Sequence, residues 1–353
     1  MADTLTKLTY KTFQESKNLF SLAHKNLSTR FLETISPSSE PKKSIPISPQ
    51  VLLRVKEKLN ELLEVDWQDA EDGIYPHNLL FDNPWDDFFR YYPIVCLDLL
   101  STWERAKQKQ YQDFSSSVDT KYYPRYYLQN FHYQTDGYLS DLSANLYDIQ
   151  VEVLFGGCAD AMRRRILSPL KKGLNLFHNE SQNMKLNVLD VACGTGRTLK
   201  LIRNSNPEIS LFGTDLSPAY LRKANELLSE IPGELPQLLQ ANAEYLPYLD
   251  NYFHGVTSVF LFHELPAPVR QKVISECFRI TKPGGVFILC DSIQMSDAPD
   301  MEGIMQNFQE RFHEPYYQNY INDDLIERLQ TVGFENIEVQ IHFMSKYLIA
   351  HKP

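Results

Sequence analysis

A stretch of nine residues, VLDVACGTG at positions 188–196, constrains the fold of this chain more than any other segment. Its first four residues, which include Asp190, have the pattern of a strand, and glycines follow at Gly194 and Gly196. Because glycine adopts backbone conformations that other residues avoid, this pattern predicts a strand that ends in a tight turn. In open α/β sheets such a turn binds part of a nucleotide-like ligand. The question is which ligand this turn holds.

The residues around this stretch have the pattern of an α/β sheet. From residue 186 onward, short apolar runs alternate with helix-like segments, which predicts a Rossmann-like, doubly wound parallel sheet with helices on both faces. The expected strands are residues 187–191, 209–214, 238–240, 256–260 and 286–290. After a helix that Gly333 ends, residues 334–352 have the pattern of two adjacent strands. We therefore predict a seven-stranded sheet with a C-terminal antiparallel hairpin, preceded by a helical N-terminal domain.

Composition divides the chain into four parts. The predicted parts are an N-terminal helical arm (1–35), a Pro/Ser-rich linker (36–49), a helical, aromatic-rich lid or substrate domain (50–180), and the α/β domain (181–353). An amphipathic helix is expected at residues 51–65, begun by Ser48 and Pro49. The basic run at residues 163–165 is interpreted as a solvated face near a helix end.

Aromatic residues are concentrated in one part of the lid. Between positions 75 and 138 they make up 17 of 64 residues, against 12% of the whole chain. One interpretation is a helical subdomain that uses them as core, since Phe and Tyr bury large areas. The other is that some of them line an apolar chamber, because each buried tyrosine hydroxyl needs a hydrogen-bond partner. On this second interpretation, part of the block faces a cavity or its mouth.

Composition also bears on partners and location. A net charge of −10 disfavours nucleic-acid binding, which uses a basic face, and favours a small-molecule partner. No run approaches the roughly 18 uncharged apolar residues of a membrane span, and no apolar core of a signal peptide appears near Met1. The five cysteines lie far apart without paired metal-ligand spacing, so neither a metal site nor a disulfide framework is expected. These features predict a cytoplasmic protein.

The spacing of the turn tests two classes of ligand. A phosphate-binding P-loop ends in Gly-Lys-Ser/Thr, whereas Gly196 is followed by Arg197 and Thr198. A dinucleotide-binding turn has a third small residue three positions after the second glycine, where this chain has Leu199. The spacing therefore excludes a P-loop and disfavours NAD or FAD.

The pattern that remains is an acid followed by small residues. Asp190, Ala192, Gly194 and Gly196 together resemble the first motif of the class I S-adenosylmethionine-dependent methyltransferases. The resemblance implies that the small residues let the backbone approach the methionyl and ribose parts of S-adenosylmethionine. It also implies that Asp190 places negative charge near the amino group of this cofactor.

Downstream segments extend the resemblance, in order, over residues 186–353. Asp215 and Leu216 follow the second predicted strand, where the resemblance implies that the acid accepts both hydroxyls of the ribose. Further cofactor-binding positions implied by the resemblance are Asn242 and Ala243 beside the adenine, and Val259 and Phe260 on the methionine side. Asn242 departs from the family pattern, which usually has an acid there, but an amide offers the adenine both a donor and an acceptor.

The resemblance implies an enzyme that transfers a methyl group to a small, aromatic or apolar acceptor by O- or C-methylation. Its motifs are most similar to the branch that includes ubiquinone and menaquinone C-methyltransferases and many small-molecule O-methyltransferases. Some acceptors need a general base, and His263, with Glu264 beside it, follows the fourth predicted strand at the edge where ligands of such sheets bind. The alternative role of His263 is to cap or pack beneath the cofactor.

The aromatic block contributes second catalytic candidates, His132 and Tyr133, and places Tyr138 as a candidate for reaching the cofactor carboxylate. These roles require the block to lie over the edge of the sheet and exclude water. The alternative for His132 is a core residue satisfied by a backbone carbonyl. Two other functions stay open: a protein methyltransferase that docks its partner through the N-terminal domain, and a non-catalytic S-adenosylmethionine-binding scaffold. The chain is expected to be a monomer or a homodimer.

Overall fold

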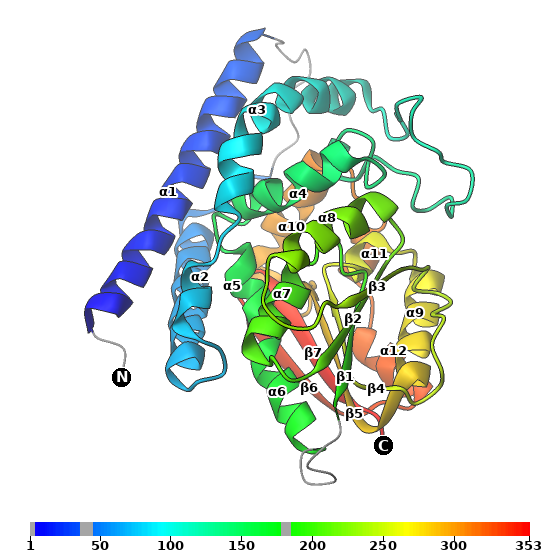
Figure 1. Ribbon diagram of the computed structural model, residues 1–353. Coiled ribbons are helices and arrows are strands. Elements are labelled where there is room, and N and C mark those ends of the chain that lie inside the picture. Colours follow the sequence, from blue (N-terminus) through cyan, green and yellow to red (C-terminus); the bar gives the residue numbers. More distant parts are fainter. Residues whose placement is uncertain (1–3, 36–44, 178–184) are drawn as a thin grey trace.

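The predicted strands form one mixed sheet in a computed structural model that describes residues 4–35, 45–177 and 185–353. The strand order is β3-β2-β1-β4-β5-β7-β6 (Figure 1), and β7 is antiparallel to both β5 and β6 while the other neighbours are parallel. The strands are β1 (Asn187–Val191), β2 (Ser210–Asp215), β3 (Gln237–Gln240), β4 (Phe253–Val259), β5 (Thr281–Ser292), β6 (Glu335–His342) and β7 (Ser345–His351). The predicted doubly wound sheet with a terminal hairpin is confirmed.

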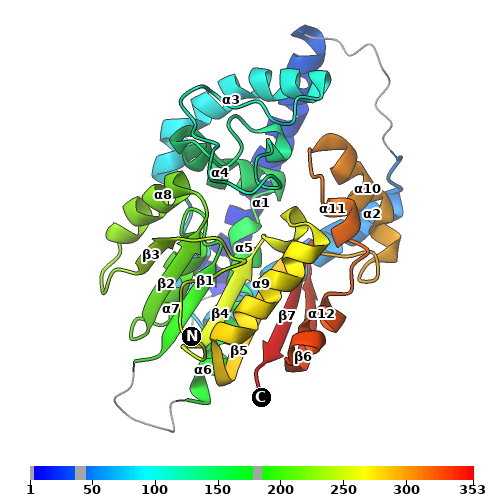
Figure 2. The same cartoon turned by 90° about the vertical axis from the view of Figure 1, so that its right-hand side faces the viewer.

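Helices cover both faces of this sheet (Figure 2). On one face, Val188 of β1 and Ile288 of β5 are fully buried in a core shared with α6, α7 and α8. Their chain neighbours Leu189 and Phe287 are buried on the other face, in a core shared with α9 and α12. The helices are α6 (Leu167–Asn175), α7 (Arg197–Ser205), α8 (Pro218–Ser229), α9 (Ala267–Ile280) and α12 (Leu325–Val332). Strands buried on both faces are apolar throughout, which is why the sequence shows them clearly.

The N-terminal half of the chain is helical, as predicted. Its elements are α1 (Thr4–Ile35), α2 (Pro49–Glu71), α3 (Trp85–Gln108), α4 (Asp141–Leu154), α5 (Ala159–Arg164) and the short 3-10 helices η1 (His77–Phe81) and η2 (Phe131–Tyr133). α2 begins at Pro49, and the Ser48 hydroxyl accepts a hydrogen bond from the amide of Val51 at 3.3 Å, so the predicted start is confirmed. Most of the predicted linker, residues 36–44, lies outside the described residues. α4 packs against α8, which places this half beside the α/β part.

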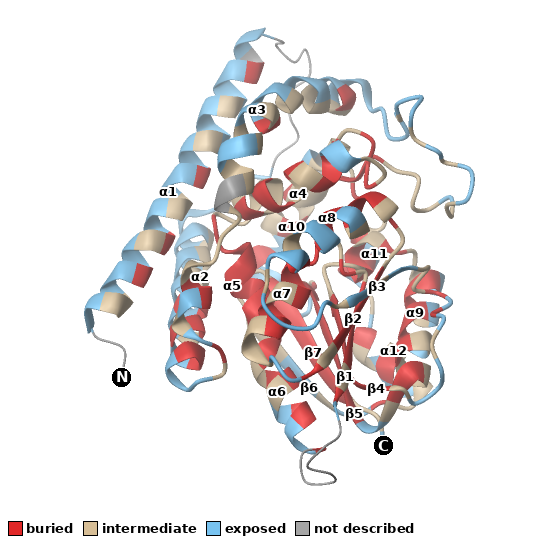
Figure 3. Cartoon of the chain, viewed as in Figure 1, coloured by how far each residue is buried: buried red, intermediate tan, exposed pale blue. Residues whose placement is uncertain are grey.

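Short elements after β4 and β5 complete the chain. They are η3 (Phe262–Glu264), η4 (Pro299–Met301), α10 (Glu302–Arg311) and α11 (Tyr317–Tyr320). Figure 3 shows that buried residues are concentrated in the sheet and the helices beside it, while α1 is largely exposed. No helix within the described ranges combines the length and the apolar character needed to cross a membrane.

The interpretation of residues 163–165 as a solvated basic face is wrong, because all three arginines are buried. Arg164 donates to both carboxylate oxygens of Asp66 in α2, at 2.8 and 2.6 Å. Arg163 pairs with Asp160 one turn earlier in α5, at 2.9 Å. A buried arginine is stable only with such partners, and the partner of Arg164 is almost a hundred residues away in the chain. The sequence around the run therefore carried no sign of the pairing.

Candidate functional site

The turn after β1 has the backbone that its glycines predict. Ala192, Gly194 and Gly196 all have positive φ angles, of 58°, 54° and 82°. At Gly194 the angle alone favours glycine, since a side chain there would meet nothing nearer than a ring atom of Tyr220 at 4.0 Å. At Gly196 an added Cβ would also lie 3.0 Å from the Cβ of Ala224 in α8. The second glycine is therefore required both by its φ angle and by the close approach of α8.

Two acids stand at the carboxyl ends of β1 and β2. The Asp215 carboxylate accepts hydrogen bonds from the amides of Gly194 at 2.9 Å and Ser217 at 2.8 Å. Burial raises the pKa of Asp215 to about 6, although these amide bonds act in the opposite direction. Asp190 is more enclosed and accepts a hydrogen bond from the Thr257 hydroxyl at 2.6 Å, and burial raises its pKa to about 7. Asp215 thus links the glycine turn to the start of α8.

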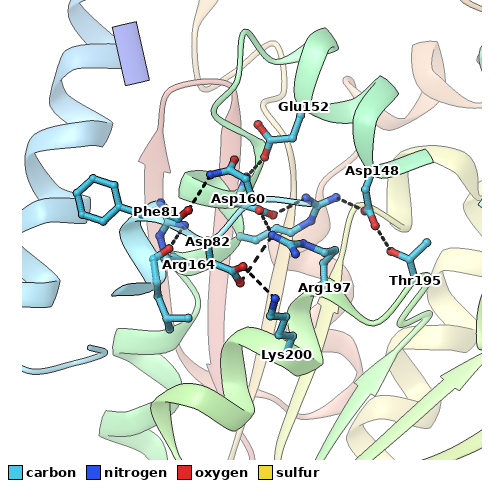
Figure 4. Close-up of polar contacts among 12 residues, drawn as sticks. Phe81, Asp82, Asp148, Glu152, Asp160, Arg164, Thr195, Arg197 and Lys200 are labelled. Atoms are coloured by element: carbon cyan, nitrogen blue, oxygen red, sulfur yellow. Dashed lines mark hydrogen bonds and ion pairs between the residues drawn. The ribbon is translucent and has the colours of Figure 1, made fainter. Parts of the chain in front are cut away.

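Ion pairs and hydrogen bonds hold α4 and α5 against this turn (Figure 4). Thr195, within the turn, donates a hydrogen bond to Asp148 of α4 at 2.8 Å. Arg197, at the first position of α7, pairs with Asp160 of α5. The position of the turn therefore depends on helices that precede the sheet in the chain.

A cavity of about 740 Å³, part of it open to solvent, lies over the turn. We call it the turn-side cavity. The residues predicted to bind the cofactor that line it are Ala192, Gly194, Asp215, Leu216, Asn242, Ala243, Val259, Phe260 and Tyr138. Asp190 and Gly196 support the turn but are not among its lining residues. The structure thus brings together nine of the eleven side chains and backbone positions that the sequence singled out.

Four tyrosines of the lid cover the turn-side cavity. They are Tyr126, Tyr127, Tyr138 and Tyr147. The Tyr126 hydroxyl donates to Glu244 at 2.8 Å, and the Tyr138 hydroxyl donates to Glu264. Phe131, between them in the chain, is 1% exposed and belongs to a packed core. Part of the aromatic block therefore packs in a core, and part of it lines the turn-side cavity.

A second cavity, of about 730 Å³ including space open to solvent, lies beside the first. We call it the apolar cavity, because most of its wall is aliphatic and aromatic. Its wall includes Val151 and Phe155 from the lid side and Ile304 and Phe308 from α10. Tyr147, Phe260 and Glu264 line both cavities. Ligands held in the two cavities would therefore meet at these three residues.

Four polar side chains form a cluster beside the apolar cavity: His132, His263 and Glu264, which line the cavity, and Glu314, which contacts His132. We call them the His–Glu cluster. Each side chain contributes one imidazole nitrogen or one carboxylate oxygen, and these four atoms all lie within 4.8 Å of one another. His132 Nε2 is 2.9 Å from Glu314 Oε1 and 4.0 Å from Glu264 Oε1. His263 Nε2 is 3.9 Å from Glu264 Oε1. Three of the four were predicted as catalytic candidates, and the fold brings them together with Glu314.

Charges within the cluster shift its protonation equilibria. Burial lowers the pKa of His263, but the nearby Asp291 carboxylate, 2.6 Å from Nδ1, outweighs it and raises the pKa to about 10. Burial and the charge of Glu314 raise the pKa of Glu264 to about 7. For His132, burial is likewise outweighed by Glu314, so its pKa is raised. The cluster therefore holds dissociable protons beside the point where the cavities meet.

The remaining catalytic candidate, Tyr133, is not brought to this site. Its backbone carbonyl accepts a hydrogen bond from Arg105 at 2.9 Å, its ring lies 5.9 Å from that of His313, and it lines neither cavity. The sequence reasoning missed Asp291 and Glu314. Asp291 could have been found, because it lies near the carboxyl end of a predicted strand, but Glu314 lies in an irregular segment with no motif around it.

Comparisons with known proteins match part of this chain to methyltransferases. Residues 188–285 match a family model described as a methyltransferase domain. A demethylmenaquinone methyltransferase from Desulfitobacterium hafniense is 28% identical over 183 residues, covering 50% of this chain and 70% of that one. A second demethylmenaquinone methyltransferase, from Listeria monocytogenes, is 33% identical over 127 residues, which are 36% of this chain. This chain therefore spans only about half (51%) of the length of that relative. A solved structure of an S-adenosylmethionine-dependent methyltransferase from Aquifex aeolicus is 19% identical in sequence, with a TM-score of 0.36. The superposition covers 52% of this chain and 90% of the Aquifex chain.

Proposed function

Since this chain belongs to the class I S-adenosylmethionine-dependent methyltransferases, we propose that it methylates a small aromatic or apolar acceptor held in the apolar cavity. The observation that carries the proposal is the pair of adjoining cavities. One is lined by the residues expected to bind the cofactor, the other is apolar, and they share Phe260 and Glu264. A methyl group can pass only between ligands that meet, and the shared wall is where such ligands would meet.

The turn-side cavity fits S-adenosylmethionine. The positive φ angles at Ala192 and Gly194 leave the backbone of the turn open to a close ligand. The Asp215 carboxylate, at the end of β2, is the proposed acceptor for the ribose hydroxyls, and Asn242 and Ala243, which line the same cavity, are proposed to contact the adenine. When bound, the cofactor supplies an electrophilic methyl group, so the protein needs mainly to align the acceptor and exclude water. The tyrosines that cover this cavity serve the second need.

The wall of the apolar cavity supports an aromatic acceptor. Phe155, Phe260, Phe308 and Tyr317 supply rings against which a flat acceptor can stack. The names of the relatives, demethylmenaquinone methyltransferases, agree with a quinol-like acceptor. We propose that the acceptor is a phenol or quinol, methylated at oxygen or carbon, and that it loses one proton for the methyl group it gains.

The His–Glu cluster is proposed to orient this acceptor. His132, His263 and Glu264 line the apolar cavity, and Glu264 also lines the turn-side cavity. Polar groups at one point of an otherwise apolar pocket determine which end of a ligand enters first. A hydroxyl or carbonyl of the acceptor directed at the cluster would place its ring against Phe260.

Location in the cytoplasm, the oligomeric state and the division into four parts stay predictions.

Calorimetric titration with S-adenosylhomocysteine tests the cofactor assignment. We expect the purified chain to bind it, and Asp215→Ala to weaken binding by about 1 to 3 kcal/mol, the range for hydrogen bonds to a charged group. Asp300→Ala, which removes an exposed acid, is the control and should leave the affinity unchanged. Incubation with labelled S-adenosylmethionine and a panel of phenols and quinols should then give one methylated product. Absence of binding would contradict the proposal, and binding without transfer to any acceptor would favour a non-catalytic scaffold.

A further inference from the structure

The His–Glu cluster gathers more charge than the orientation of an acceptor requires. Its members come from three separate segments: His132 from η2, His263 and Glu264 from η3, and Glu314 from the connection between α10 and α11. Two imidazole nitrogens and two carboxylate oxygens, one from each side chain, lie within 4.8 Å of one another. Imidazole nitrogens and carboxylate oxygens that converge in this way are the donor set of many protein metal sites.

The separations between these atoms suit a single ion. Ligand atoms held tetrahedrally at about 2.1 Å from a metal are about 3.4 Å apart. In the cluster the corresponding separations are 2.9 Å from His132 Nε2 to Glu314 Oε1, 3.9 Å from His263 Nε2 to Glu264 Oε1, and 4.0 Å from His132 Nε2 to Glu264 Oε1. These three values lie on both sides of the tetrahedral separation, and the other pairs lie within 4.8 Å, so side-chain adjustments of about one ångström would complete the coordination.

Glu314 is a buried carboxylate that a bound cation would stabilise. Its side chain is fully buried, and neither of its carboxylate oxygens receives a hydrogen bond in suitable geometry from any residue that the structure describes. It pairs with His132, whose own Nδ1 is buried and has no hydrogen-bond partner among the same described residues. A buried carboxylate without donors is costly, and a bound dication beside it would offset that cost.

The surroundings of the cluster orient its donors. The Asp291 carboxylate lies 2.6 Å from His263 Nδ1, which leaves Nε2 directed toward Glu264. The Tyr138 hydroxyl donates to Glu264. A carboxylate behind a histidine, and a hydroxyl on a ligating carboxylate, are the outer contacts that hold ligands around bound metals.

We propose that His132, His263, Glu264 and Glu314 bind one divalent first-row transition-metal ion. A mixed set of two imidazoles and two carboxylates suits Mn²⁺, Fe²⁺, Co²⁺ or Zn²⁺ better than the all-oxygen preference of Mg²⁺ or Ca²⁺. Three of the four side chains, His132, His263 and Glu264, line the apolar cavity, so an oxygen substituent of the acceptor can reach the ion there as a fifth ligand. That last role rests on the proposed function, whereas metal binding itself does not.

Calorimetric titration with ZnCl₂ and with MnCl₂ tests this site. The protein is the whole chain, treated beforehand with a chelator to remove bound metal. We expect one ion per chain. Glu314→Gln and His263→Asn should weaken binding by at least tenfold, and Asp291→Asn by about tenfold to a hundredfold, as for other outer contacts. Glu335→Gln, which neutralises an exposed carboxylate on β6, is the matched control and should bind the ion as the unmodified chain does.

Binding of S-adenosylhomocysteine, measured on the same samples, shows that each variant is folded. The inference is overturned if the folded, unmodified chain binds neither ion stoichiometrically, or if the cluster variants bind as tightly as Glu335→Gln. Unchanged methylation of an acceptor by metal-free protein, together with no ion binding, would overturn the metal site and leave the proposed function standing. Stoichiometric binding that the cluster variants lose would support the site even if no acceptor were methylated.

Discussion

The two cavities that meet at Phe260 and Glu264 are built in opposite ways. The turn-side cavity takes most of its wall from residues 192–265, at the ends of successive strands of one sheet. The apolar cavity takes its wall from η2, α4, η3, α10 and the connection between β6 and β7, which are spread over more than two hundred residues. The first depends on local turns and the second on how distant segments pack. This difference predicts that the two respond differently to substitution.

The largest expected effect tests whether the two halves fold as one unit. Arg164→Met removes the buried partner of Asp66 and should lower the free energy of unfolding by about 3 to 5 kcal/mol, because a buried carboxylate is left unpaired. The matched change Arg222→Met breaks an exposed pair with Asp141 and should cost at most about 1 kcal/mol. Denaturant unfolding measures both.

The probes for that experiment are built into the chain. The three tryptophans, Trp67, Trp85 and Trp103, all lie in the helical half, whereas circular dichroism reports the whole molecule. If the halves are coupled, both signals shift together in Arg164→Met. A shift of the fluorescence transition alone would show that the helical half unfolds separately from the α/β part. The two halves would then be independent folding units.

The next prediction concerns the local construction of the turn. Gly196→Ala should lower the free energy of unfolding by about 2 to 4 kcal/mol, since it adds a steric contact with Ala224 to the cost of a positive φ angle. Gly73→Ala has a positive φ of 69° but nothing within 4 Å of the added Cβ, so it should cost only about 1 to 2 kcal/mol. Equal losses for the two variants would show that α8 does not restrict the turn.

A third change separates the two cavities functionally. Ile304→Trp places a larger side chain in the wall of the apolar cavity and should raise the KM for the acceptor about tenfold, with the affinity for S-adenosylhomocysteine unchanged. Val339→Trp, on the exposed face of β6, is the control and should alter neither value. Steady-state kinetics and calorimetry give the two numbers. A loss of cofactor affinity in Ile304→Trp would contradict the separation of the cavities.

The smallest effect is a pH dependence of cofactor binding. Burial raises the pKa of Asp215 to about 6, and the proposed contact with the ribose hydroxyls needs its deprotonated form as the acceptor. The affinity for S-adenosylhomocysteine should therefore be constant above about pH 7 and fall as the pH drops below 6, by about tenfold at pH 5. Titrations across this range measure it. Asp215→Asn should bind more weakly and lose this dependence, and a break that persists in the variant would assign it to another acid.

The sheet and the cofactor side could be predicted because their signals are local. A buried strand followed by Gly194 and Gly196 can be recognised within nine residues, and the acid of Asp215 follows the next strand. His263 and Glu264 were found for the same reason, as residues just after a strand. The main error on this scale was the run at residues 163–165, where exposure was inferred from charge alone although each arginine has an acid partner.

The sequence by itself determined the fold class, the order of the strands along the chain and the residues around the turn, because each depends on backbone preferences and apolar periodicity within short segments. Only the tertiary structure decided which tyrosines cover a cavity and which fill a core, and that His132, His263, Glu264 and Glu314 share one point. Such contacts depend on how helices pack across the sheet, and no spacing along the chain encodes them. Glu314 shows this most clearly, since its role is set entirely by neighbours from other segments.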